Sequence, residues 1–271
     1  MSPIAIFDSG YGGLTVFERI RALMPEYDYI FLGDNARNPY GTRSFDIVYQ
    51  YTLQAVRRLF DFGAPLVILA CNTASAKALR NIQQRDLPSI DASRRVLGVI
   101  RPSVEAIGQF TNSKCVGIFG TQGTVDSMSY PIEIQKLRPD IRVFQQACPM
   151  WVPIVENGEF DAPGADYFVE KYTRALMHQC PDIDAIILGC THYPLLAPKI
   201  QNILPHGVRL LGQGDIVAAS LRDYLNRHTE MDARLSRGGT VRFYTTESTD
   251  KFERTAEIFF HGRLDVEHLT L

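Results

Sequence analysis

The chain of 271 residues is longer than most domains with a single hydrophobic core, so we expect two domains. Apolar residues make up 45% of the chain and charged residues 21%, a balance that excludes a disordered protein and is typical of a folded one. The formal net charge of −2, without any long basic segment, argues against nucleic acid and anionic membranes as partners and favours a small molecule.

The N-terminal sequence, the lengths of the apolar runs and the spacing of the cysteines indicate where the protein is located and whether its thiols are free. The N-terminal sequence MSPIAIFDSG has no basic segment before its apolar run, and no run approaches the ~20 residues that span a bilayer. We therefore expect a cytoplasmic protein that is not bound to a membrane. The five cysteines are scattered, which suits neither a disulfide framework nor a CxxC metal site. We expect free thiols and no metal.

Short apolar runs recur along the chain and alternate with segments of helical periodicity. One such segment extends from Val48 to Phe62, with apolar residues at spacings of three and four. Unbroken apolar strands separated by helices are typical of parallel sheets that are buried on both faces, so we predict a doubly wound α/β fold. The predicted strands are residues 4–7, 29–32, 66–70, 96–100, 116–119, 185–189 and 208–211, followed by a helix at 216–225 and a strand at 241–244.

The second half of the chain repeats the pattern of the first. The first strand and its polar turn resemble VGIFGTQG at 116–123, and VILACNT at 67–73 resembles IILGCTH at 186–192. Both pairs occur in the same order and at similar separation, which indicates a duplication. We predict two pseudo-symmetric α/β domains with the active site in the cleft between them, formed by residues 1–100 with 208–271 and by residues 101–207.

Polar turns follow four of the predicted strands, at the edge where open parallel sheets bind ligands. Small hydroxyl and amide side chains dominate these turns, and helix N-termini in the same place favour anions. We therefore expect a dicarboxylate ligand held by neutral donors, although each of these residues is equally typical of a helix N-cap. The four turns are Asp8-Ser9-Gly10, Cys71-Asn72-Thr73, Thr121-Gln122-Gly123-Thr124 and Cys190-Thr191-His192.

Each half of the chain places one cysteine in such a turn, Cys71 in the first half and Cys190 in the second. If the halves face each other, the two thiols meet across the cleft. Inverting a stereocentre by proton transfer needs a base on one face of the carbon and an acid on the other, and a thiolate with a thiol provides both. Most single cysteines are instead small buried apolar residues, the role that we assign to Cys115 and Cys180, with Cys148 left undecided.

Two further residues lie close to these thiols in the sequence pattern. His192 follows Cys190 by two positions, and we expect it to control the proton at that sulfur, although many histidines are only structural. Asp8 ends the first strand at a Gly-rich turn. It either caps the following helix or, opposite Cys71, orients a substrate ammonium group or tunes that thiol.

Five motifs, in this order, resemble the glutamate racemases of the aspartate/glutamate racemase family over essentially the full chain. The resemblance implies two α/β domains related by pseudo-symmetry and no pyridoxal phosphate or metal. It also implies interconversion of L- and D-glutamate, which supplies D-glutamate for peptidoglycan. The motifs are FDSGYGGLTV (7–16), GDNARNPYG (33–41), ACNTASA (70–76), VGIFGTQGTV (116–125) and GCTHYPLL (189–196).

The resemblance also implies roles for individual residues. The thiol matching Cys71 takes the proton from D-glutamate, and the thiol matching Cys190 takes it from L-glutamate. Glu156, in PIVENGE, resembles an acidic residue of the family near the second thiol. The implied catalytic residues are Cys71, Cys190, Asp8, His192 and Glu156. The expected substrate contacts are Asp8, Ser9, Pro39, Tyr40, Gly41, Asn72, Thr73, Thr121, Thr124, Thr191 and His192.

Three alternatives compete with this interpretation. An aspartate or hydantoin racemase would share the fold and the thiol pair, but the complete set of motifs argues against it. A non-catalytic amino-acid binding protein would need no cysteine in each half. A pyridoxal phosphate racemase needs a lysine, and nothing around Lys77, which follows ACNTASA, indicates a cofactor pocket. The expected partners are glutamate and, in a homodimer, a second copy of the chain.

Overall fold

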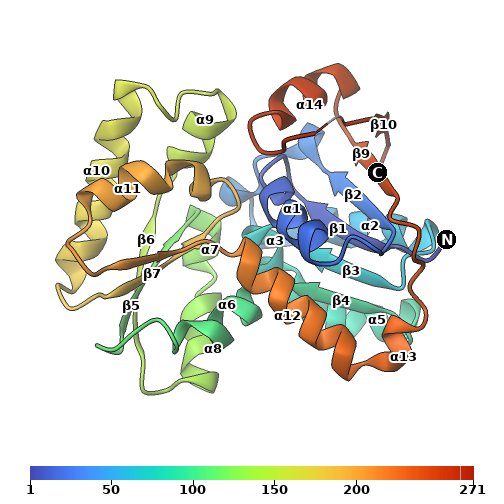
Figure 1. Ribbon diagram of the computed structural model, residues 1–271, viewed down its shortest axis with the longest axis horizontal. Helices are drawn as coiled ribbons and strands as arrows, with labels where there is room; N and C mark the ends of the chain where they lie inside the picture. Colours follow the sequence, from blue (N-terminus) through green and yellow to red (C-terminus); the bar gives the residue numbers. More distant parts are fainter. Residues whose placement is uncertain (263) are drawn as a thin grey trace.

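The computed structural model describes residues 1–262 and 264–271 and consists of two lobes, each built on a parallel sheet (Figure 1). The strand order is β10-β9-β2-β1-β3-β4 in the first sheet and β6-β5-β7-β8 in the second. All strand pairs are parallel. The predicted α/β class, with two parallel-sheet units, is confirmed.

The central strands are buried at every residue because helices cover both faces of each sheet. The first sheet contains β1 (Ile4–Asp8), β2 (Tyr29–Gly33), β3 (Leu66–Leu69), β4 (Arg95–Gly98), β9 (Val241–Thr245) and β10 (Val266–His268). The second contains β5 (Cys115–Gly120), β6 (Arg142–Ala147), β7 (Ala185–Gly189) and β8 (Arg209–Leu211).

The order β2-β1-β3-β4 in the first sheet matches β6-β5-β7-β8 in the second, as the sequence repeat predicts. Cys71 follows β3 and Cys190 follows β7, so the two thiols occupy equivalent positions in the two lobes. The sequence analysis did not predict β6 or β10. The predicted strand at 96–100 ends early, because Ile100 already begins a helix.

The strand at 209–211 corrects the predicted division of the chain. β8 pairs with β7, with Arg209 opposite Ala185, so it belongs to the second sheet. The expectation that all residues from 208 onward join the first domain is wrong for this strand, since the chain returns to the first lobe only after it. A three-residue apolar run carries no signal for which sheet it joins. The returning helix α12 (Gly214–Arg227) then packs on α1 (Gly13–Leu23).

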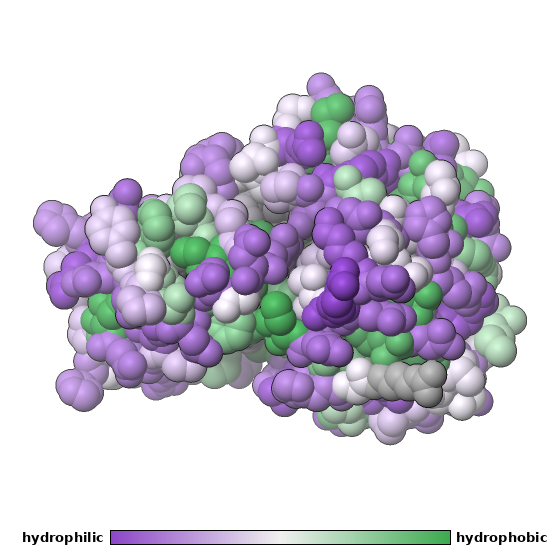
Figure 2. All heavy atoms as spheres, turned by 90° about the horizontal axis from the view of Figure 1, so that it is seen from above, coloured by the Kyte–Doolittle hydropathy of each residue, from purple (hydrophilic) through white to green (hydrophobic). Residues whose placement is uncertain are grey.

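Helices surround both sheets, and those predicted at 48–62 and 216–225 correspond to α2 and α12. Among the described residues, no helix is long and apolar enough to cross a membrane. Hydrophilic side chains cover much of the face shown in Figure 2. The remaining α-helices are α2 (Phe45–Asp61), α3 (Asn72–Lys77), α4 (Leu79–Asn81), α5 (Leu87–Ile90), α6 (Ile100–Ile107), α7 (Gln122–Asp126), α8 (Ser129–Leu137), α9 (Trp151–Glu156), α10 (Pro163–Gln179), α11 (Ala197–Ile203), α13 (Thr229–Asp232) and α14 (Thr249–Ala256). Shorter turns are η1 (Asn35–Arg37), η2 (Tyr40–Thr42), the π-helical η3 (Ile82–Asp86) and η4 (Tyr193–Leu196).

A buried hydrogen-bond network joins the two lobes where the chain crosses between them. Gln213, at the return crossing, accepts a hydrogen bond from Asn72 Nδ2 at 2.6 Å. Its Nε2 donates to Ser103 Oγ at 2.7 Å and to the Tyr130 hydroxyl at 2.9 Å. Tyr130 in turn donates to Asn72 Oδ1 at 2.8 Å. One glutamine therefore satisfies polar groups from both lobes.

We expect Gln213→Ala to lower the free energy of unfolding by about 2–3 kcal/mol, because it leaves the buried Nδ2 group of Asn72 without its acceptor. Chemical denaturation checks this value. Gln135→Ala is the matched control, since Gln135 is exposed on α8. Equal stability of the two variants would contradict the role assigned to the network.

Candidate active site

A cavity of about 90 Å³ lies between the lobes at the carboxyl ends of the strands. Both Cys71 and Cys190 line it, one from each lobe. The two strand-end thiols that the sequence singles out therefore face the same small space. The other predicted residues that line it are Ser9, Pro39, Tyr40, Gly41, Asn72, Thr73, Thr121, Thr191 and His192.

Three predicted residues do not line the cavity. Thr124 is fully buried behind it, where its hydroxyl lies 3.1 Å from that of Thr121 and 3.4 Å from that of Thr73. Thr124 supports the two threonines in front of it, and the expected substrate contact through Thr124 stays a prediction. Asp8 and Glu156 lie next to lining residues and are described below.

Cys71 caps the N-terminus of α3 and is held by two neighbours. Its sulfur accepts a hydrogen bond from the backbone N–H of Ala74 at 3.4 Å and lies 3.3 Å from Ser9 Oγ. Burial raises the pKa of the Cys71 thiol to about 12, and the carboxylate of Asp8 adds to the shift. In the protein without substrate, Cys71 is a protonated thiol at neutral pH.

Asp8 is buried at the end of β1, with one carboxylate oxygen held and the other free. Oδ2 accepts a hydrogen bond from the backbone N–H of Gly10 at 3.0 Å, while Oδ1 has no partner among the described residues. Burial raises the pKa of Asp8, and the nearby positive charge of His192 opposes this shift. A buried acceptor without a partner is uncommon and indicates a place for a ligand's donor.

Cys190 lies beside a histidine that is itself held by a carboxylate. The Nδ1 atom of His192 is 3.7 Å from the Cys190 sulfur, and its Nε2 is 2.8 Å from Glu156 Oε1. Burial lowers the pKa of His192, but the hydrogen bonds with Cys190 and Glu156 outweigh this effect and raise it to about 10. His192 is therefore an imidazolium at neutral pH, placed between the Cys190 sulfur and the Glu156 carboxylate.

Arginine takes little part in this cavity. Arg37 holds the loop before it, with Nε 2.7 Å from Asp34 Oδ2 and the guanidinium 4.1 Å from the centre of the Tyr51 ring. Tyr40 also donates its hydroxyl proton to Asp34. Arg37 and Arg43 are both absent from the described lining, whose uncharged polar groups are hydroxyls and amides. The expectation of neutral donors for a carboxylate ligand stays a prediction.

The sequence analysis missed several lining residues. Cys148 is the most informative of them, because it follows β6 and burial raises its pKa well above the usual value, with Cys190 adding to the shift. The strand before it, RVFQQA, is partly exposed and has no continuous apolar run, so the sequence does not predict it. Recognising β6 would have shown a third cysteine at a strand end. The other missed residues are Asn38, Thr42, Gln122, Pro149, Val152 and Pro153.

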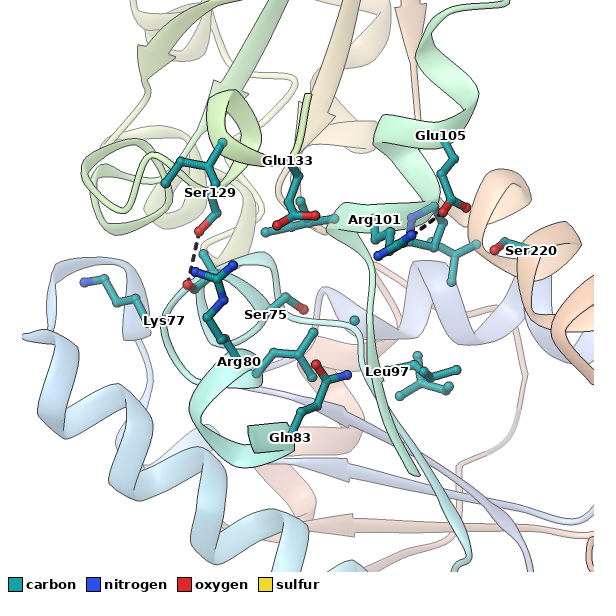
Figure 3. Close-up of a pocket in the computed structure, with 18 of the residues that line it drawn as sticks. Ser75, Lys77, Arg80, Gln83, Leu97, Arg101, Glu105, Ser129, Glu133 and Ser220 are labelled. Carbon is teal, nitrogen blue, oxygen red and sulfur yellow. Dashed lines mark hydrogen bonds and ion pairs between the residues drawn. The ribbon is translucent and has the colours of Figure 1, made fainter. Parts of the chain in front are cut away.

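A larger cavity of about 760 Å³ lies elsewhere, lined by residues of α3, η3, α6, α8 and α12 (Figure 3). It contains no cysteine, and Arg101 on its wall is paired with Glu105 at 2.9 Å. Lys77, the lysine considered for a Schiff base, lines this cavity and donates to the backbone carbonyl of Arg43 at 2.7 Å. We place the active site in the smaller cavity, because the groups that can transfer protons meet there.

A glycine beside the second thiol makes a close approach possible. A Cβ atom on Gly12 would lie 2.4 Å from Thr191 Oγ1 and 2.5 Å from His192 Nδ1. We expect Gly12→Ala to displace the Cys190 turn and to lower kcat/KM by about 100-fold, since a shift of ~1 Å at a reacting group has effects of that order. Steady-state kinetics measure this loss of kcat/KM. Gly164→Ala, where a Cβ meets nothing within 4 Å, is the control, and equal activity of both variants would contradict the expectation.

Known proteins match this chain along nearly its whole length. The family model described as Asp/Glu/Hydantoin racemase matches residues 15–221. The glutamate racemase of Roseobacter denitrificans is 40% identical and is matched over 97% of this chain and 98% of its own. The glutamate racemase of Streptococcus equi subsp. equi is 37% identical and is matched over 99% of this chain and 98% of its own.

Solved structures agree with these relatives. The glutamate racemase isoform RacE1 from Bacillus anthracis superposes with a TM-score of 0.90 at 33% identity, covering 100% of this chain and 98% of that one. The enzyme from Francisella tularensis, solved in complex with D-glutamate, gives a TM-score of 0.88 at 30% identity over 99% and 97% of the chains. The resemblance noted in the sequence motifs is confirmed: the chain belongs to the aspartate/glutamate/hydantoin racemase family.

Proposed function

We propose that this chain is a glutamate racemase that moves protons at Cα between two thiols and supplies D-glutamate for peptidoglycan. The observation that carries the proposal is that Cys71 and Cys190, one from each lobe, line a single cavity. A base on one face of Cα and an acid on the other are what inversion requires. The proposal needs no cofactor, because the two thiols supply both groups.

The unequal environments of the thiols favour one starting state. Cys71 holds its proton because its pKa is raised to about 12. With Cys71 protonated, Cys190 is the base for L-glutamate: it takes the Cα proton, and the Cys71 thiol delivers a proton to the opposite face. The His192 imidazolium lies beside the Cys190 sulfur. D-glutamate requires the reverse proton distribution.

The polar groups around the thiols suit an amino acid with two carboxylates. The free Oδ1 of buried Asp8 can accept a hydrogen bond from the substrate ammonium. The hydroxyls of Thr73 and Thr121 lie 2.9 Å apart across the lobes and, with Ser9, offer donors to carboxylates. The amide of Asn72 is engaged with Gln213 and Tyr130, so we assign that side chain chiefly to shaping the cavity.

Glutamate is the proposed substrate because the relatives at 37–40% identity are named glutamate racemases. An aspartate racemase from Picrophilus torridus is only 17% identical, with a TM-score of 0.56, and shares the fold alone. The test is circular dichroism of L-glutamate and L-aspartate incubated with purified protein, with chelator and without pyridoxal phosphate. We expect kcat/KM to favour glutamate by at least ~10-fold, the scale of one methylene group. No change with glutamate, or faster reaction of aspartate, would overturn the proposal.

The assembly and location of the protein follow as predictions. A homodimer stays a prediction, which analytical ultracentrifugation tests directly. A cytoplasmic location also stays a prediction, and fractionation of the host cell tests it. Neither affects the proton-transfer step, since both thiols come from one chain.

A further inference from the structure

Two cysteines outside the active site meet at the opposite edge of the second sheet. Cys115 is the first residue of β5, and Arg142, the first residue of β6, is its partner in the strand register. Cys180 follows directly after α10, which packs against β6. The thiols therefore gather where two strands begin and a long helix ends, whereas Cys71 and Cys190 follow the ends of their strands.

The side chains at this edge form a compact cluster. The sulfurs of Cys115 and Cys180 and a carboxylate oxygen of Asp182 all lie within 4.8 Å of one another. The Nη2 atom of Arg142 is 2.9 Å from the Cys115 sulfur and 3.7 Å from the Cys180 sulfur. Both cysteines are buried, but the side chains of Arg142 and Asp182 are 64% and 73% exposed. The thiols, which are only 2% and 6% exposed, thus lie beneath two exposed polar side chains.

The guanidinium decides between the chemistries open to such a pair. A divalent metal would compete with the positive charge of Arg142 at the same sulfurs, so a cation site is disfavoured. A neighbouring guanidinium stabilises a thiolate, which is the form that attacks an oxidant. A disulfide requires the two sulfurs, which lie within 4.8 Å of one another, to close to about 2.05 Å.

We propose that Cys115 and Cys180 are a redox-reactive dithiol that a hydroperoxide converts into an intramolecular disulfide. The Cys115 thiolate attacks the peroxide oxygen, the O–O bond breaks, and a sulfenic acid forms as the leaving hydroxide or alkoxide takes up a proton. The Cys180 sulfur then attacks the sulfenic sulfur and loses its proton, and a second molecule leaves as water. In total the two thiols lose two electrons and two protons. Hydrogen peroxide is reduced to two molecules of water, and an organic hydroperoxide is reduced to an alcohol and one molecule of water.

This site goes beyond the proposed racemase activity and uses different cysteines. The disulfide would fasten the end of α10 to the start of β5, the strand that leads into Thr121 of the active site. A link between Cys71 and Cys190 in the active site should form more slowly, because the Cys71 thiol is held protonated by burial and is a poor nucleophile. The cluster therefore offers an oxidation site that is separate from catalysis.

The test is a time course of the reduced protein with a small excess of hydrogen peroxide, stopped by alkylation and analysed by mass spectrometry without reduction. Trypsin leaves Cys180 and Cys190 in one peptide, so a second cleavage before Asp182 is needed to separate them. We expect a peptide containing Cys115 joined to one containing Cys180, before any link that involves Cys71 or Cys190. Linkage of Cys115 to another cysteine, or full alkylation of both thiols after the catalytic cysteines have oxidised, would overturn the proposal.

Variants distinguish oxidation of this dithiol from general oxidation of the cysteines in the protein. Cys180→Ser and Cys180→Ala should both abolish the link, and either one suffices if the other does not fold. Arg142→Gln should slow formation of the disulfide by about 10-fold at pH 7, because the variant lacks the positive charge beside the attacking sulfur. Arg138→Gln, an arginine paired with Asp140 shortly before β6, is the matched control and should leave the rate unchanged. An Arg142→Gln rate equal to that of the control would overturn the proposed role of the guanidinium.

Discussion

Replacing either Cys71 or Cys190 with serine is expected to reduce glutamate racemisation by at least ~10³-fold, because general acid or base catalysis contributes 10²–10⁴-fold and a hydroxyl does this poorly at neutral pH. Racemisation needs both faces of Cα. The equilibrium constant between mirror-image substrates is one, so kcat/KM must fall equally in the two directions for each variant. Polarimetry or circular dichroism measures the loss. Cys180→Ser under reducing conditions is a matched control, since this cysteine lies outside the cavity lining.

A half-reaction separates the two thiols where racemisation cannot. Elimination of HCl from a β-chlorinated glutamate needs only the base that removes the Cα proton. We expect the L isomer to react with Cys71→Ser and to fail with Cys190→Ser, and the D isomer to show the reverse. The surviving reactions should stay within about 10-fold of the wild type. Loss of both isomers in both folded variants, or full racemisation by either, would contradict the two-thiol mechanism.

Glu156→Gln is expected to have the next largest effect, through His192. Glu156 accepts a hydrogen bond from His192 and helps raise its pKa to about 10, after the hydrogen bond with Cys190. A neutral amide removes that support, so the alkaline limb of the kcat/KM profile should move to lower pH by roughly one unit, with about a 10-fold loss of activity near its new edge. pH-dependent steady-state kinetics measure the shift.

The same substitution should change how stability depends on pH. The pKa of His192 is raised from 6.5 to about 10 in the folded protein, so its stabilising contribution is fully present below pH 6.5 and is lost as the pH rises through about 10. The difference in unfolding free energy between wild type and Glu156→Gln should therefore shrink across this interval. Glu159→Gln, at an exposed position nearby, is the control. A profile unchanged from that control would contradict the role given to Glu156.

Much of the fold could be predicted because its central strands are unbroken apolar runs. β1, β3, β5 and β7 are buried on both faces, which leaves a strong signal in the sequence. The edge strand β6 has a partly exposed, polar sequence, and β10 has only three residues, so neither produces that signal. The sequence predicts β8 as a strand. The sheet to which it belongs depends on its pairing with β7, which the local sequence does not encode.

The candidate site shows the same division between local and distant information. Cys71 and Cys190 could be found because each follows a buried strand in a repeated motif, and strand ends meet at one edge of a sheet. The link between Glu156 and His192 spans 36 positions, and no local pattern predicts that geometry. Thr124 lies in the same polar turn as Thr121, but the 3.1 Å contact between their hydroxyls is a feature of the folded turn that the sequence alone does not predict.

Deuterium incorporation during the first turnovers tests the central claim most directly. Purified protein is incubated with L-glutamate in D₂O without added cofactor, and Cα labelling of both enantiomers is measured at early times by NMR or mass spectrometry. Two opposed thiols predict that newly formed D-glutamate carries deuterium while the remaining L-glutamate keeps its proton, because removal and delivery use different groups. D-glutamate that retains the original proton, or the absence of any exchange, would contradict the account.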